Sequence, residues 1–241
     1  MKKLTSKQIT LIIAILVIIV VGGLWVFDSY KARHPQEDKN GKTLITYVDR
    51  GIKEEDLPIF QQRVEDIKAE LEQAQSEGKV PPSIYLRLGN AYYTLGDLGN
   101  AKENYDKILA EYPQDGPAHE NLGQALLEMG DPDGALAHWK ESLEYVNNEI
   151  TYFKLADLFA EHFPNRSEEA LKLLEYGVEN IGQTPGLMVA LGNWYKDNGD
   201  IERAVSHYKV ATVLSPNDKE IKDVLVQLEQ VARQIRTQQV Q

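Results

Sequence analysis

The chain has 241 residues, a formal net charge of −11 at pH 7 and no cysteine. The excess of acidic residues disfavours nucleic acid and anionic membrane surfaces as partners. It favours either plain solubility or a basic protein partner. Because there is no cysteine, disulfide bonds cannot hold the fold together.

An uncharged apolar run follows a short basic tail at the start of the chain. Residues 1–8 contain three lysines, and residues 9–27 contain no charged side chain. A helix of this length, at about 1.5 Å per residue, nearly spans a hydrocarbon core of about 30 Å. A cleaved signal peptide is the alternative, but its apolar region is usually shorter and ends at a small-x-small site, which is missing here. The sequence therefore predicts a transmembrane signal anchor at 9–27 that contacts the lipid bilayer.

The basic tail also bears on orientation, because a positive tail before a first hydrophobic helix usually stays inside. The lysines and arginines after the span are as numerous, so the count alone does not decide. We expect a single-pass plasma (inner) membrane protein with a cytoplasmic N-terminus and an extracytoplasmic main domain.

Residues 28–53 are polar and rich in charge, and His34-Pro35 and Asn40-Gly41 interrupt any long element. The strand-like run 43–48 has no second strand to pair with. We interpret residues 28–53 as a juxtamembrane linker.

A helix is predicted over residues 54–77, where apolar side chains recur at three- and four-residue steps. The stripe consists of Leu57, Phe60, Val64, Ile67, Leu71 and Ala74. Gly78 and Pro81 end the helix. Because the stripe must be buried, we expect an N-terminal capping helix that packs on the next element; a dimer contact is the alternative.

A leucine followed by a small residue then recurs at intervals of roughly 34 residues. The pairs are Leu88-Gly89, Leu122-Gly123, Leu155-Ala156 and Leu191-Gly192. Large, small and proline residues accompany these pairs at matching positions. In the first unit they are Tyr85, Tyr92, Ala101, Tyr105 and Pro113, and in the last unit Met188, Tyr195, Ala204, Tyr208 and Pro216. This pattern resembles the tetratricopeptide repeat (TPR), a helix–turn–helix unit of about 34 residues.

The resemblance implies an all-α TPR-type helix–turn–helix solenoid, which would stand behind the one N-terminal transmembrane helix predicted above from the apolar run. Four repeats are expected over 82–218, at 82–115, 116–148, 149–184 and 185–218. An amphipathic helix over 219–237 would close the apolar end of the array as a C-terminal capping helix.

Turns between the two helices of a unit are marked by Gly96-Asp97, Gly130-Asp131 and Gly199-Asp200. Glycine ends a helix in a left-handed conformation at little cost, and aspartate caps the next helix. The third unit departs from the pattern: Ala156 replaces the glycine, and the longer segment 161–167 replaces the turn.

No residue pattern for catalysis, a metal or another cofactor is present. The five histidines have no metal-ligand spacing, and no phosphate loop or nucleophile elbow occurs. His119 takes the place of a packing residue. We expect neither an enzyme nor a cofactor.

The resemblance also implies a binding groove, because the first helix of each TPR unit lines a concave face. The groove residues are then Leu86, Asn90, Tyr93, Glu120, Gln124, Leu127, Phe153, Asp157 and Asn193. One TPR subgroup binds a terminal carboxylate through basic side chains, but Leu86, Phe153 and Asp157 stand at those places. A carboxylate needs charged donors to offset its desolvation. The mixed apolar and acidic groove instead suits an amphipathic or basic protein or peptide segment.

The resemblance and the predicted anchor together indicate a membrane-anchored interaction scaffold or adaptor, with a role in envelope assembly or secretion by analogy only. The alternatives are a chaperone-like holder of unfolded translocated polypeptides and a self-assembling structural membrane protein.

Overall fold

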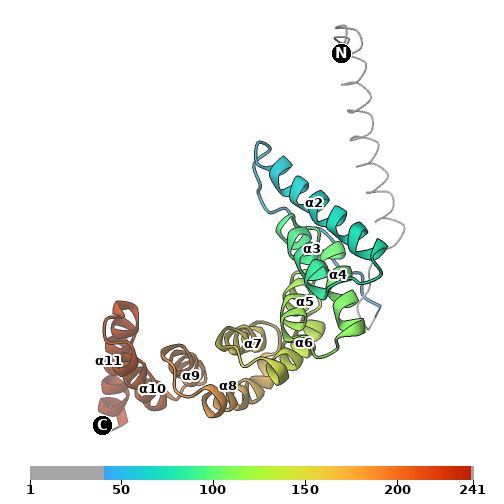
Figure 1. Ribbon diagram of the computed structural model, residues 1–241. Helices are drawn as coiled ribbons and strands as arrows, with labels where there is room; N and C mark the ends of the chain where they lie inside the picture. Colours follow the sequence, from blue (N-terminus) through green and yellow to red (C-terminus); the bar gives the residue numbers. More distant parts are fainter. Residues whose placement is uncertain (1–40, 240–241) are drawn as a thin grey trace, which may run out of the picture.

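The computed structural model describes residues 41–239, which form ten α-helices and one 3-10 turn. The elements are α2 (Leu57–Ser76), α3 (Pro82–Thr94), α4 (Leu98–Glu111), α5 (Gly116–Glu128), α6 (Pro132–Tyr145), α7 (Glu149–His162), η1 (Pro164–Arg166), α8 (Ser167–Ile181), α9 (Pro185–Asp197), α10 (Ile201–Leu214) and α11 (Lys219–Gln239). Figure 1 shows one curved array with α3, α5, α7, α9 and α11 on its inner side and α4, α6, α8 and α10 on its outer side. The all-α solenoid expected from the sequence is confirmed.

Three of the four helix pairs are joined by the glycine–aspartate turn. Gly96, Gly130 and Gly199 have φ values of 80°, 86° and 83°, which a residue with a Cβ rarely adopts. The aspartate that follows each glycine accepts a hydrogen bond from the backbone N–H three residues later and so caps the second helix. The third pair lacks this turn, and η1 connects its helices instead.

Within those same three pairs, a glycine of the first helix faces an aromatic ring of the second. A Cβ placed on Gly89, Gly123 or Gly192 would lie 2.5 Å from Tyr105, Trp139 or Tyr208, respectively. The glycine therefore lets the ring pack directly against the backbone of its partner helix. The third pair has Ala156 in place of the glycine and the fully buried Leu174 in place of the ring.

Helices α2 and α11 cover the two ends of the array. Val64 and Ile67 of α2 are buried against Ile84 and Leu88 of α3. At the other end α11 packs on α10 through Ile221, Leu228 and Ala232, while its remaining surface is exposed. Each end helix thus uses one apolar face and leaves the other in water.

An extended stretch, residues 42–50, runs along the turns of the first two repeats, and we call it the N-terminal segment. The amide N–H of Ile45 donates to Met129 O at 2.9 Å, and that of Val48 donates to Gly96 O at 2.9 Å. Leu44 is 5% exposed and belongs to the main core. Part of the stretch interpreted as a linker therefore contacts the repeats directly.

The localisation expected from the sequence needs correction. Among residues 41–239, no helix combines the length and the apolar character needed to cross a bilayer. The long helices α2 and α11 each carry several charged residues, and charged side chains are costly in a hydrocarbon core. The basic tail 1–8 and the span predicted at 9–27 lie outside the described residues. The described structure thus gives no support for a single-pass membrane protein or for a role at the envelope.

Candidate partner-binding groove

The residues predicted to line the groove fall on the four helices of the inner side (Figure 1). Three lie on α3, three on α5, two on α7 and one on α9. None of the nine is fully buried. The structure separates them into two sets: six lie in the first two repeats, and Phe153, Asp157 and Asn193 come together in the last two.

In the first two repeats the chain itself supplies a ligand, Arg50 of the N-terminal segment. Its guanidinium carbon lies 4.5 Å from the centre of the Tyr93 ring, its Nε donates to Tyr93 O at 3.3 Å, and its Nη2 lies 2.8 Å from Glu128 Oε2. The Tyr93 hydroxyl donates to Glu128 as well. Burial, followed by the contact with Glu128, raises the pKa of Tyr93 to about 12. This end of the groove is therefore a cation site that is already filled.

Other predicted groove residues in this half hold neighbouring helices together. Glu120 accepts a bond from Lys154 Nζ at 3.0 Å and another from Asn148 Nδ2 at 3.1 Å, which joins α5 to α7. Asn90 Oδ1 accepts from the hydroxyl of Tyr105 at 2.8 Å and from Asn121 Nδ2 at 3.1 Å. These polar side chains are engaged, and binding through them would first require breaking their bonds.

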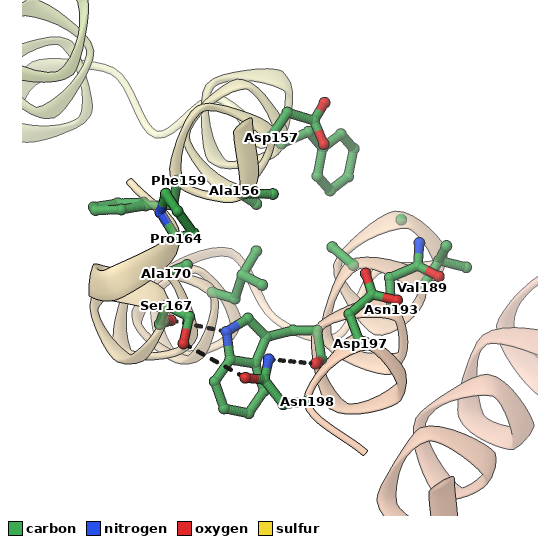
Figure 2. Close-up of a pocket in the computed structure, with 16 residues that line it drawn as sticks. Ala156, Asp157, Phe159, Pro164, Ser167, Ala170, Val189, Asn193, Asp197 and Asn198 are labelled. Carbon is green, nitrogen blue, oxygen red and sulfur yellow. Dashed lines mark hydrogen bonds between the residues drawn. The ribbon is translucent and has the colours of Figure 1, made fainter. Parts of the chain in front are cut away.

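In the last two repeats a cavity of about 580 Å³ lies between α7, α8 and α9, and we call it the third-repeat cavity (Figure 2). Its apolar lining includes Phe153, Ala156, Leu174, Val189, Ala190 and Trp194. Asp157 stands on α7 and faces Asn193 and Asp197 of α9 across the opening. The volume is in the usual range for a ligand pocket, with apolar walls and a few polar groups at the mouth.

The cavity is located where the third repeat lacks its aromatic ring. Tyr105, Trp139 and Tyr208 fill the corresponding space in the other repeats, whereas Leu174 lines the cavity together with Ala156. Leucine is smaller than any of these rings and has no hydroxyl or indole N–H. In the fourth repeat the Tyr208 hydroxyl donates to Asn193 Oδ1 at 2.9 Å, while Leu174 offers Asp157 no such donor.

One wall of the cavity is fixed by hydrogen bonds. Trp194 Nε1 donates to Ser167 O at 2.8 Å, and Asn198 Nδ2 donates to Trp194 O at 2.8 Å, as Figure 2 shows. The indole is thereby held between α8 and α9. Sequence reasoning did not select Trp194, although an indole at this position of the fourth repeat, where the first two have alanine, was a usable signal.

The mouth of the cavity is acidic. No lysine or arginine is among the described residues that line it. Burial, followed by the charge of Glu161, raises the pKa of Asp157. Asp197 has an exposed neighbour, Lys196, at 3.4 Å. A cation at this mouth would therefore favour the ionised form of Asp157.

His119, for which we expected a packing role, contacts His138 of α6 and the backbone of Pro113. Its ring is 7% exposed, its Nδ1 lies 2.8 Å from Nδ1 of His138, and its Nε2 lies 3.0 Å from Pro113 O. Among residues 41–239 no group of three or more potential metal ligands occurs. The pair serves packing between α5 and α6.

Comparison with known proteins agrees with this architecture. Tetratricopeptide repeat models match residues 86–144 and 187–220. A crystal structure of MamA has a TM-score of 0.55 at 19% identity, over 70% of this chain and 96% of that one. MamA 41-end from Desulfovibrio magneticus RS-1 has a TM-score of 0.52 at 16% identity, over 65% and 88% of the two chains. The structure of pilF of Pseudomonas aeruginosa has a TM-score of 0.52 at 19% identity, over 64% of this chain and 69% of that one. At such identities the likeness shows the fold alone.

The chain thus carries tetratricopeptide repeats. Such repeats are generally non-enzymatic scaffolds that bind protein partners. A comparison with curated proteins gave no significant match. The two matched segments leave out the third repeat, which is the repeat that departs from the pattern and that borders the cavity.

Proposed function

We propose that the chain is an adaptor that binds a protein partner on the concave face of its last two repeats. One observation carries this proposal: the third-repeat cavity opens between α7 and α9, whereas Arg50 of the N-terminal segment already occupies the site between Tyr93 and Glu128 in the first two repeats. The nine groove residues predicted from the sequence therefore do not contribute equally. Phe153, Asp157 and Asn193 are the ones that line the cavity.

A general holder of unfolded chains is less well supported by the same surface. Such a protein needs broad apolar exposure, while the third-repeat cavity combines apolar walls with a polar rim. The arrangement favours recognition of a defined segment.

The test is crosslinked capture of partners from the source cells by the full-length chain. We compare the wild type with Phe153→Asp in the cavity and with Tyr176→Asp, a matched change at an exposed residue of α8 that does not line the cavity. Circular dichroism confirms that both variants are folded. A partner lost with F153D and kept with Y176D supports the proposal. Equal capture by all three chains places binding elsewhere and contradicts it.

A further inference from the structure

We infer that the third-repeat cavity receives one bulky apolar side chain of a partner peptide, with a lysine or arginine of the same peptide at its acidic mouth. This inference rests on the proposed function and adds the chemistry of the partner. Three independent features of the chain support it: the ring that is missing, the charge at the mouth and the internal ligand at the other end of the groove.

The first feature defines the apolar guest. In the other three repeats an aromatic ring from the second helix packs against the small residue of the first helix. In the third repeat Leu174 and Ala156 stand in their places, and both line a cavity of about 580 Å³. Phe153 and the anchored indole of Trp194 form its walls. A Phe, Trp or Leu side chain from outside would supply the contacts that the repeat does not make for itself.

The second feature defines the charged neighbour of that guest. Asp157 and Asp197 stand at the mouth, and Glu161 of α7 lies close enough to act on Asp157. In the described structure no lysine or arginine forms an ion pair with Asp157. A cation brought by the partner would offset the repulsion between Asp157 and Glu161.

The third feature shows how this face binds a cation. Arg50 lies over the Tyr93 ring and beside the carboxylate of Glu128. Phe153 and Asp157 offer the same combination of an aromatic ring and a carboxylate at the third-repeat cavity. We therefore expect a cation of the partner to contact Phe153 and Asp157 in the way that Arg50 contacts Tyr93 and Glu128. This favours a cationic peptide over a neutral small molecule.

The probe is a set of short fluorescein-labelled glycine–serine peptides, each with one Phe, Trp or Leu and one Arg at varied spacing. Binding to the full-length chain is measured by fluorescence anisotropy. We expect that alanine in place of the apolar residue weakens the best peptide by about 30-fold. Glutamate in place of arginine weakens it by about tenfold, less at high salt.

Two variants test the two halves of the site. The double variant Ala156→Gly, Leu174→Tyr gives the third repeat the glycine–aromatic pair of the others, so the chain fills its own cavity. We expect it to abolish binding, while Lys172→Gly, which introduces glycine at an exposed residue of α8 away from the cavity and controls for the loss of helix stability, keeps it. Asp157→Asn removes one charge without changing shape. It should weaken the arginine peptide by about three- to tenfold, while Glu179→Gln, the same change at an exposed residue away from the cavity, leaves binding unaltered.

The outcomes separate this inference from the proposed function. The inference is wrong if no peptide binds, or if D157N and the variant with the filled cavity both bind the peptides as well as the wild type does. Capture of a partner that is lost with F153D would still support the adaptor. Binding of neutral and arginine-containing peptides with equal affinity would also overturn it. If partner capture is insensitive to F153D but the peptides behave as expected, the cavity binds peptides and the adaptor proposal fails.

Discussion

The two halves of the repeat array use the same unit in opposite ways. In the first two repeats an aromatic ring packs against glycine, the N-terminal segment crosses both turns, and Arg50 occupies the groove. In the last two repeats the third unit lacks both the ring and the glycine–aspartate turn, and a cavity opens on the same face. The proposed binding surface thus lies where the repeat pattern is incomplete, and the well-formed repeats serve as its support.

The largest expected effect is the loss of folding stability when the large side chain of the second helix of a repeat is removed. Trp139 is 1% exposed, and its Nε1 donates to Glu120 O at 3.0 Å. Trp139→Ala should lower the free energy of unfolding by about 3–5 kcal/mol. Leu174→Ala at the corresponding place should cost about 2–3 kcal/mol, because leucine is smaller than tryptophan and has no indole N–H to donate. Urea denaturation followed by circular dichroism measures both. Equal losses would contradict the difference drawn here between the two halves.

A smaller effect is expected from the attachment of the N-terminal segment. Leu44→Ala removes the buried anchor of this segment and should cost about 2 kcal/mol. Ile45→Ala is the control, because Ile45 is its neighbour in sequence but is 53% exposed. It should change stability by less than about 0.5 kcal/mol. If both variants behave alike in urea denaturation, the segment does not contribute to the first half of the array.

The ion pair inside the groove contributes less again. The side chains of Arg50 and Glu128 are 27% and 22% exposed, so water screens part of their attraction. Arg50→Ala should cost about 1 kcal/mol or less, and hydrogen exchange at the amide of Val48 should become faster. The control is Lys53→Ala, because the side chains of Lys53 and its ion-pair partner Glu55 are 75% and 76% exposed. An unchanged exchange rate in R50A would show that the backbone bonds alone hold the segment.

The smallest effect is a dependence of stability on pH. Burial, followed by the charge of His119, lowers the pKa of His138. The unfolded chain therefore binds the proton first as pH falls, and stability is complete above the unfolded pKa of about 6.5 and declines below it. His138→Gln should reduce this decline between pH 7.5 and 5.5, whereas His162→Gln, at an exposed histidine, should not. Urea midpoints at the two pH values test it; an equal decline in both variants would assign the effect to other groups.

Much of the fold could be predicted because its determinants are close together in sequence. Gly130 and Asp131 are adjacent, and Gly123 and Trp139 lie within one unit, so a repeated pattern exposes them. Repeat register also placed Phe153, Asp157 and Asn193 on the inner side. The docking of Arg50 could not be predicted, because its partners Tyr93 and Glu128 belong to two different repeats far along the chain.

The cavity was also beyond the sequence pattern. The longer connection between α7 and α8 shifts Leu174 away from the spacing that relates Gly89 to Tyr105. A count by fixed intervals therefore misses that leucine stands in the place of a ring. Only the packing of three helices shows the volume that remains open.

The docked N-terminal segment has a consequence for synthesis on the ribosome. Lys42 Nζ donates to Gly130 O across 88 residues of sequence. The segment therefore leaves the ribosome well before the turn that receives it. At a synthesis rate of about 5–20 residues per second this delay is roughly 4–18 s. During that time the N-terminal segment lacks its bonds to Met129 and Gly130, so the first two repeats are complete only after the second turn has been synthesised.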